Sequence, residues 1–268
     1  MVSNSEFKEA VRKYWDDPDT ISIIDKELHK IEIDTVCRYL RSTDSLADIG
    51  CGNGIATIKY AEKVKKCIGF ERSDYLRQQA IENARQSELT NLSIQAVDVL
   101  ELSKISEKFD VVVTQRVLIN LESWEDQKQA ILNIYGLLKP GGRYIMIENT
   151  NDAFISLNEM RHQVALEPIP QHWHNRFFDY ERLMEFLEGQ FQLLKTHDFG
   201  LYYFLTRVYV QMFASFKGFG KNAVKDQIFE KADEAARILY ELCADRIKID
   251  GCRALGPIQC FVLRKEKL

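Results

Sequence analysis

Short apolar runs alternate with amphipathic segments through the middle of the chain. The runs predict strands at 46–49, 67–70, 92–97, 109–114 and 143–147, and the segments predict helices at 54–63, 74–86 and 124–137. Near-continuous apolar strands are typical of a parallel sheet, because crossover helices bury both of its faces. The alternation therefore predicts an α/β fold with a doubly wound sheet.

Further elements are expected on both sides of this region. They are helices at 5–16 and 20–42, a loop at 149–178, a helix at 179–188, a strand at 191–196, helices at 201–216 and 222–246, and a strand at 258–263. Two of these helices have a predicted apolar face. The faces are formed by Ile24, Leu28, Ile31, Val36 and Leu40 in the first, and by Ile228, Ala232, Ala235, Leu239 and Leu242 in the second.

These elements suggest how the chain is divided. We expect residues 1–43 to form an N-terminal helical cap and residues 44–268 to form the main domain. Ligands of open α/β sheets bind outside the carboxyl ends of the strands. Insertions at about 149–178 and 200–256 follow such strand ends, so we expect both to lie over the binding site.

Composition excludes several other classes of protein. The 268 residues are 46% hydrophobic and 28% charged, as in ordinary globular chains. A net charge of −4 argues against a broad basic surface for nucleic acid. No apolar run has the length of a membrane helix, and the first residues lack a signal-peptide pattern. The six cysteines show no Cys-x-x-Cys pair, so we expect reduced thiols and a cytoplasmic location.

The strand at 46–49 runs directly into a glycine-rich turn. The turn reads Gly50-Cys51-Gly52-Asn53-Gly54, and Asp48 stands two residues before its first glycine. Glycines let the backbone turn tightly and let a ligand lie against it without a Cβ in the way. The spacing G-x-G-x-G differs from the dinucleotide fingerprint G-x-G-x-x-G. A ligand site of a different type from the common dinucleotide site is therefore expected.

Acidic residues follow the next two strands. Glu71 ends the second strand, where a carboxylate can accept hydrogen bonds from both hydroxyls of a ribose. Asp98 follows the third strand and can accept from an exocyclic adenine amine, while the backbone of Val99 can donate to the ring. Three consecutive strand ends thus offer contacts for an adenosine.

Together these segments resemble the class I S-adenosylmethionine-dependent methyltransferases. The resemblance covers about residues 44–150 and rests on Asp48 to Gly54, Glu71, Asp98, the run Asp110-Val111-Val112-Val113 and the turn Leu138-Lys139-Pro140-Gly141-Gly142-Arg143. It implies S-adenosylmethionine as cofactor and a seven-stranded sheet whose last strand, here 258–263, is antiparallel.

The same resemblance implies roles for individual residues. The segment with Asp48, Gly50, Cys51, Gly52, Asn53 and Gly54 would pack against the methionine part. Glu71 would bind the ribose, Asp98 and Val99 would face the adenine, and Gln115 would lie near the methionine amino group. Cys51 is not expected to be a catalytic thiol.

Two other classes remain open on this kind of sheet. A nicotinamide-dependent oxidoreductase would need its third glycine three residues after the second, where this chain has Ile55. The intact glycine turn and its acidic partners speak against a binding protein that keeps the fold without chemistry, although they indicate only cofactor binding. Binding of the cofactor alone would not distinguish such a protein from an enzyme.

The sequence says less about the molecule that accepts the methyl group. No Asn-Pro-Pro-Tyr-type segment follows the fourth strand, which favours oxygen over a planar amine as the methylated atom. Histidines in the 149–178 loop can remove a proton from a hydroxyl, and arginines can hold a phosphate or carboxylate. The candidate bases are His162, His172 and His174, and the candidate anion-binding residues are Arg116, Arg161 and Arg176.

These residues also allow plainer interpretations. The loop can instead be a polar segment whose Trp173, Phe177 and Phe178 pack under the helices. No metal is expected, because His172 and His174 with His162 or Glu167 fit no closed zinc pattern.

The sequence thus predicts a methyltransferase that acts on a small polar acceptor, anionic or sugar-containing, most readily on oxygen. The stretch from Arg116 to Leu121 weakly resembles enzymes that methylate small metabolites or sugars of bacterial surface polysaccharides. N-methylation of a small metabolite is the alternative.

Overall fold

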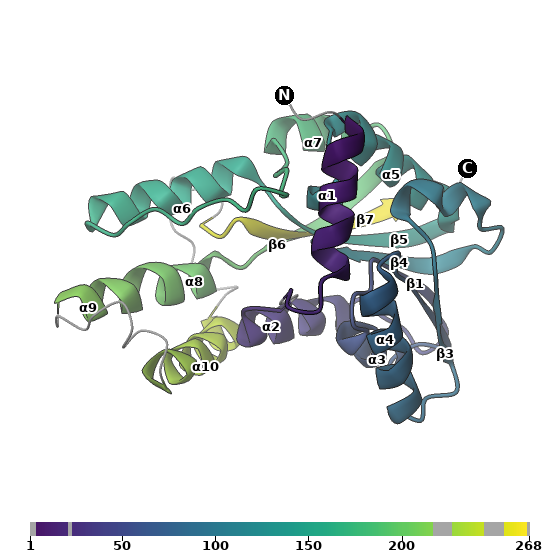
Figure 1. The fold of residues 1–268 in the computed structure, drawn as a ribbon, viewed down its shortest axis with the longest axis horizontal. Coiled ribbons are helices and arrows are strands. Elements are labelled where there is room, and N and C mark those ends of the chain that lie inside the picture. The colour runs from purple at the N-terminus through teal and green to yellow at the C-terminus, as the bar shows by residue number, and fades with distance from the viewer. Residues whose placement is uncertain (1–3, 21–22, 217–226, 244–254, 267–268) are drawn as a thin grey trace.

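A seven-stranded sheet forms the centre of the protein. The computed structural model describes residues 4–20, 23–216, 227–243 and 255–266 (Figure 1). The strands are β1 (Ser45–Ile49), β2 (Lys66–Phe70), β3 (Leu92–Gln95), β4 (Phe109–Gln115), β5 (Leu138–Asn149), β6 (Phe191–Asp198) and β7 (Ile258–Lys265). Their order is β3-β2-β1-β4-β5-β7-β6, and β7 runs antiparallel to both β5 and β6. The predicted sheet with an antiparallel last strand is confirmed.

Helices cover both faces of this sheet. They are α1 (Asn4–Asp16), α2 (Lys26–Cys37), α3 (Ile55–Ala61), α4 (Asp74–Gln86), η1 (Val99–Lys104), η2 (Leu118–Asn120), α5 (Trp124–Leu137), α6 (Asn151–Gln163), α7 (Tyr180–Glu188), α8 (Gly200–Tyr203), η3 (Phe204–Tyr209), α9 (Val210–Phe216) and α10 (Gln227–Cys243). The η3 segment is a π-helical turn that joins α8 to α9, so the helix expected at 201–216 is present with a widened middle.

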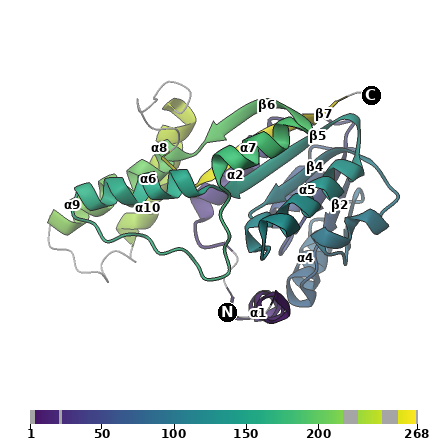
Figure 2. The same cartoon turned by 90° about the horizontal axis from the view of Figure 1, so that it is seen from above.

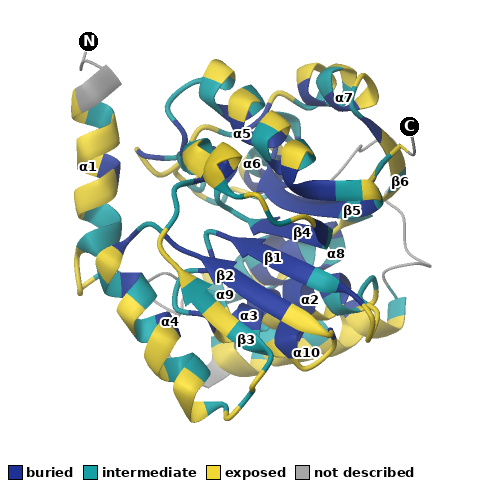
Figure 3. Cartoon of the chain, turned by 90° about the vertical axis from the view of Figure 1, so that its right-hand side faces the viewer, coloured by how far each residue is buried: buried dark blue, intermediate teal, exposed yellow. Residues whose placement is uncertain are grey.

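Alternating side chains of each strand supply two separate cores. Val111 and Val113 of β4 face the core beneath α2 and α3, whereas Val112 faces the core beneath α5 and α7. Figure 3 shows the central strands buried and the outer faces of the helices exposed. This double burial explains why the strands read as continuous apolar runs.

Several helices project beyond the edge of the sheet as an arm. Figures 1 and 2 show α6, α8, α9 and α10 extending away from the strands on the same side of the molecule. Asp25, just before α2, holds this arm: Oδ1 accepts from the Tyr202 hydroxyl at 2.8 Å, and Oδ2 pairs with Arg207. Arg237 of α10 pairs with Glu27 at 2.7 Å. The arm therefore fixes the start of α2.

The second N-terminal helix is shorter than predicted. It begins at Lys26 rather than residue 20, because Asp25 caps it by accepting a hydrogen bond from the Leu28 backbone at 2.9 Å. Ile24 precedes the helix and is 75% exposed, so its place on the apolar face was wrong. Leu28, Ile31 and Val36 are buried as expected.

Two predictions about the second half of the chain were also wrong. Residues 151–163 of the expected loop form α6, whose buried side chains are Ala153, Leu157 and Arg161. In α10, Leu239 and Leu242 are exposed, while Ala236 and Tyr240 are buried, so the helix is rotated from the predicted orientation. Ile228 and the ends of the helix expected at 222–246 lie outside the described side chains. None of the helices in the described ranges has the length and apolarity needed to span a membrane.

Candidate active site

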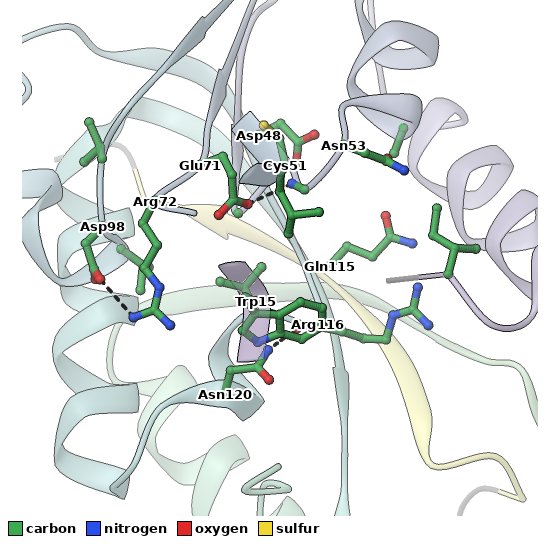
Figure 4. Close-up of a pocket in the computed structure, with 18 of the residues that line it drawn as sticks. Trp15, Asp48, Cys51, Asn53, Glu71, Arg72, Asp98, Gln115, Arg116 and Asn120 are labelled. Atoms are coloured by element: carbon green, nitrogen blue, oxygen red, sulfur yellow. Dashed lines mark hydrogen bonds and ion pairs between the residues drawn. The ribbon is translucent and has the colours of Figure 1, made fainter. Parts of the chain in front are cut away.

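A cavity opens at the carboxyl ends of β1, β2 and β4 (Figure 4). It encloses about 1050 Å³ when the open space at its mouth is counted. The N-terminal segment lines one side of the cavity through Trp15 of α1, Ile23 before α2 and His29 of α2. The cavity thus joins the strand ends that the sequence singled out to a wall of N-terminal residues.

The glycine-rich turn has three glycines in the left-handed region. Their φ angles are 68° at Gly50, 56° at Gly52 and 78° at Gly54. A Cβ on Gly50 would lie 2.5 Å from a methyl of Val117, and one on Gly54 would lie 3.1 Å from the Cβ of Ala80. A Cβ on Gly52 would meet no atom within 4 Å. Gly50 and Gly54 are therefore needed for packing, whereas Gly52 borders open space in the cavity.

Glu71 is tied to the backbone around this turn. One carboxylate oxygen accepts from the Gly52 N–H at 2.9 Å and the other accepts from the Ser73 N–H at 2.8 Å. Burial raises the pKa of Glu71, and these two hydrogen bonds partly oppose that effect. Each oxygen keeps a lone pair that can accept from a ligand hydroxyl.

Asp98 and Arg72 meet at the opposite side of the cavity from Arg116 (Figure 4). Asp98 Oδ1 accepts from the Leu100 backbone at 2.9 Å, and Oδ2 lies 3.3 Å from the Arg72 guanidinium. Val99 also lines the cavity. This side offers both a carboxylate and a planar cation to a nucleobase.

Asp48 and Cys51 lie at the base of the turn. Asp48 is 3% exposed, and its Oδ2 accepts from the Thr57 hydroxyl at 2.6 Å. Burial raises the pKa of Asp48 to about 7, although the Thr57 bond opposes the shift. Burial also raises the pKa of the Cys51 thiol, so this thiol stays protonated at neutral pH.

Gln115, at the end of β4, connects the cavity to α2. Its Nε2 donates to Glu32 Oε2 and to His29 Nδ1, the latter at 3.0 Å, and its Oε1 accepts from the Tyr60 hydroxyl at 3.3 Å. Glu32 is fully buried and lies 3.2 Å from the Arg116 guanidinium. A polar cluster of these five residues therefore underlies one end of the cavity.

The backbone turns sharply at Arg116. This residue has a φ of 56°, which is uncommon for a side chain with a Cβ, and its N–H donates to the Ile147 carbonyl at 2.7 Å. Buried Glu148 accepts from the next three backbone N–H groups, those of Val117, Leu118 and Ile119, at 3.0, 2.9 and 3.3 Å. Glu148 therefore holds the turn that directs Arg116 and Asn120 to the cavity.

The three predicted bases lie outside the cavity wall. His174 is buried among aromatic rings, with its ring centre 4.4 Å from that of Tyr14 and 5.7 Å from that of Trp15. Burial and neighbouring His172 lower the pKa of His174 to about 4. His162 borders a separate shallow hollow on α6. Trp15 lines the cavity, but none of the three histidines does. Their roles as bases stay predictions.

The predicted arginines also lie apart from one another. Arg116 lines the cavity. Arg161 is buried in the arm, where it donates to the backbone carbonyl of Glu167 and to Gln211. The Arg176 guanidinium lies 5.3 Å from the Phe7 ring centre. The structure therefore brings one of the three arginines to the cavity.

The sequence reasoning missed several residues that line or support the cavity, namely Trp15, His29, Glu32, Arg72 and Asn120. His29 and Glu32 are three residues apart on one buried helix face, where a polar pair is unusual. That buried pair was a usable signal. Within the described ranges, no group of three or more His, Cys, Asp and Glu side chains converges as a metal site would.

This fold and this cavity define the class I methyltransferase type. A family model described as a methyltransferase domain matches residues 40–207. Because this match covers more than half of the chain, the protein belongs to the class I S-adenosylmethionine-dependent methyltransferase family.

Curated relatives match a smaller part. The chain is 29% identical over 140 residues to an uncharacterized methyltransferase of Schizosaccharomyces pombe, which covers 48% of this chain and 49% of that protein. It is 31% identical over 96 residues to a ubiquinone biosynthesis O-methyltransferase of Coxiella burnetii, which covers 36% of this chain and 39% of that protein. The chain thus spans about half the length, or less, of these relatives.

Solved structures share the fold over nearly the whole chain. The N-methyltransferase NodS from Bradyrhizobium japonicum WM9, in complex with S-adenosylhomocysteine, has a TM-score of 0.57 at 16% identity and covers 97% of this chain and 98% of its own. The [4+2]-cyclase SpnF has a TM-score of 0.57 at 20% identity and covers 98% of this chain and 93% of its own. These likenesses show the fold alone, because one fold can support many different reactions.

Proposed function

We propose that this chain transfers the methyl group of S-adenosylmethionine to a small polar acceptor. The observation that carries the proposal is that the Gly50–Gly54 turn, Glu71, Asp98 and Arg116 all border one cavity. The first three supply contacts for an adenosine and its methionine part. Arg116 and its neighbours supply a second, separate polar end for the acceptor.

The residues present fit the cofactor. Gly52 leaves space at the turn that a side chain would fill, so the backbone can lie against a ligand there. Glu71 would hold the ribose hydroxyls with its remaining lone pairs, and Asp98 and Val99 would face the adenine. When bound, the cofactor supplies an electrophilic methyl group on a sulfonium. The protein's part is to position the acceptor atom in line with that methyl group and to exclude water.

Oxygen on an anionic or sugar-containing acceptor remains our proposal for the methylated group. Arg116 supports it, because a guanidinium suits carboxylate and phosphate oxygens. The wall that Trp15, Ile23 and His29 form at one side of the cavity supports a small molecule over a polymer. N-methylation of a small metabolite is the alternative, and its test is a screen with acceptors of both kinds.

Calorimetric titration with S-adenosylmethionine, S-adenosylhomocysteine and NAD tests the proposal. We expect micromolar binding of the two sulfur compounds and none of NAD. Glu71→Ala should weaken binding about tenfold or more, because a buried ribose then loses a charged partner. Glu82→Ala is the matched control, since Glu82 is exposed on α4 and pairs with Arg85. Binding of NAD alone would contradict the proposal.

A further inference from the structure

His29 is the one histidine among the described residues that lines the cavity. It is 9% exposed, and α2 carries it to the end of the cavity where Gln115 and Arg116 lie. Its Nδ1 is 3.0 Å from Gln115 Nε2, while its buried Nε2 has no hydrogen-bond partner within the described part of the chain. A buried polar nitrogen without a partner is costly unless a ligand or water completes it.

The neighbours of Gln115 determine which way its amide points. Oε1 accepts from the Tyr60 hydroxyl, and Nε2 faces the Glu32 carboxylate. Burial raises the pKa of Tyr60, so its hydroxyl keeps the proton that it donates. A reversed amide would set Oε1 against the carboxylate of Glu32. The NH₂ group of Gln115 therefore faces both Glu32 and His29.

This orientation determines the tautomer of His29. Gln115 donates to Nδ1, so Nδ1 is a hydrogen-bond acceptor and carries no proton. Glu32 Oε2 is 3.6 Å from Nδ1, which is longer than a hydrogen bond, so Nδ1 does not donate to this carboxylate. A neutral imidazole without a proton on Nδ1 carries it on Nε2. His29 thus offers an N–H donor rather than a lone pair.

Arg116 adds further donors at the same end of the cavity. Within the described ranges, its guanidinium pairs with Glu32, which occupies part of a planar group with five N–H donors. Its side chain is 25% exposed. Glu32 thus pairs with one side of the Arg116 guanidinium and leaves its other N–H donors at this end of the cavity.

We propose that His29 Nε2–H and the Arg116 guanidinium together bind a hydrogen-bond-accepting oxygen of the methyl acceptor. The acceptor is then a compound that presents a carboxylate or carbonyl oxygen at this end, and His29 binds it without removing a proton from it. This inference rests on the proposed function, because it takes this end of the cavity as the acceptor site. Gln115 then orients His29 at the acceptor end, in place of the contact with the methionine amino group that the resemblance implied.

The position of His29 is firmly held, as such a role requires. Asp25 caps α2 one turn before His29 and is anchored to Tyr202 and Arg207 of the arm. Donors on rigid elements bind with less loss of conformational entropy than donors on mobile loops. The arm thereby contributes to acceptor binding without lining the cavity.

Nitrogen-15 NMR of histidine-labelled protein tests the tautomer directly. The His29 signals are assigned by their loss in His29→Gln. We expect a neutral ring protonated on Nε2 in the free protein and in the protein saturated with S-adenosylhomocysteine. Gln115→Met, which lacks the donor to Nδ1, should shift the ring toward a mixture of tautomers. A ring protonated on Nδ1, or an imidazolium at neutral pH, would overturn the inference.

Matched small probes test the chemistry of the bound group. Benzoate and benzylamine are titrated into protein saturated with S-adenosylhomocysteine. We expect benzoate to bind more tightly than benzylamine. His29→Ala should weaken benzoate binding about tenfold, which corresponds to ~1.4 kcal/mol. His29→Gln should retain most of the binding, because its amide N–H can replace Nε2–H.

A control and a prior measurement make the outcomes distinguishable. His197→Gln is the control, because His197 bonds to Tyr39 outside the cavity wall and its loss should leave benzoate binding unchanged. Preference for benzylamine, absent benzoate binding, or equal binding by His29→Ala would overturn the inference. If S-adenosylhomocysteine itself fails to bind, the proposed function fails, while the NMR result on the free protein still tests the tautomer.

Discussion

A Cβ on Gly50 would lie 2.5 Å from Val117, whereas a Cβ on Gly52 would meet no protein atom within 4 Å. Both residues have a positive φ, so both resist substitution, but the reasons differ. Gly50 is required by the packing of the folded chain. A side chain on Gly52 would meet no protein atom, so we expect its substitution to act mainly on the ligand that the cavity binds. Folding and ligand binding should therefore be separable within one turn.

Gly52→Val is expected to abolish binding of S-adenosylmethionine while the protein still folds. The new side chain would occupy the space against which the ligand lies, and the strained φ would cost about 1–2 kcal/mol of stability. Calorimetric titration gives the affinity, and thermal unfolding shows whether the variant is folded. Normal affinity in a folded variant would place the cofactor elsewhere.

Gly136→Ala is the control for that substitution. A Cβ on Gly136 also meets no atom within 4 Å, but the residue lies within helix α5. Alanine should raise helix stability slightly and leave cofactor affinity unchanged.

The sequence predicted one side of the site residue by residue, but not the other. Asp48 lies near the end of a predicted strand, and Glu71 and Asp98 each follow one. The carboxyl ends of neighbouring parallel strands meet at one edge of the sheet. The structure places all three around one cavity. His29 and Glu32 come to the site through the packing of α2 against α3 and α10. Their polar pair on an otherwise apolar helix face was a signal that they differ from core residues, but it did not show which residues they would meet.

At the scale of the element, the turn between β4 and η2 depends on a single buried carboxyl group. Glu148 of β5 accepts three backbone N–H groups from this turn, which carries Arg116 and Asn120. Burial raises the pKa of Glu148 to about 7, although the three hydrogen bonds oppose the shift. The folded protein therefore holds a proton there at pH values where the unfolded chain does not.

This shift predicts that stability falls as the pH rises. The contribution of Glu148 is fully present below its ordinary pKa of 4.5 and is lost as the pH rises through about 7. Asp48 has the same sign, with its pKa raised to about 7. His174 has the opposite sign, but its effect is confined to the range below its ordinary pKa of 6.5. Tm should therefore fall by a few degrees between about pH 6.5 and 8.

Glu148→Gln should flatten this dependence, because the amide does not titrate and still accepts through Oε1. Thermal unfolding across the same pH range measures the slope. Glu82→Gln, an exposed change on α4, should keep the slope of the natural sequence. An unchanged slope in Glu148→Gln would show that Glu148 does not titrate as described.

Elements were predictable where their buried face is apolar. The strands of the sheet meet this condition, and their positions are close to those expected. Helix α6 does not meet it, because its buried positions are Ala153, Leu157 and Arg161. Only one of these is a large apolar residue, so the buried positions form no apolar pattern with the period of a helix. In helix α10 the apolar side chains form a broad face, and the structure buries Ala236 and Tyr240 at one side of it rather than the predicted Leu239 and Leu242.

At the scale of the whole molecule, the sheet and the arm have separate tasks. No described residue of the insertions at 149–178 or 200–256 lines the cavity, whereas α1 and α2 both contribute to its wall. The arm instead anchors α2 through Asp25, as described above, and α2 carries His29. A role of the insertions in direct contact with the acceptor stays a prediction.

The central claim is that one cavity holds the cofactor between Glu71 and Asp98 and leaves the His29 and Arg116 end for the acceptor. A crystal structure of the complex with S-adenosylhomocysteine tests it most directly. We predict the ribose hydroxyls on Glu71, the adenine beside Asp98 and Val99, and the sulfur facing the space bounded by His29 and Arg116. An S-adenosylhomocysteine molecule bound outside this cavity, or one that fills the His29 and Arg116 end itself, would contradict the account.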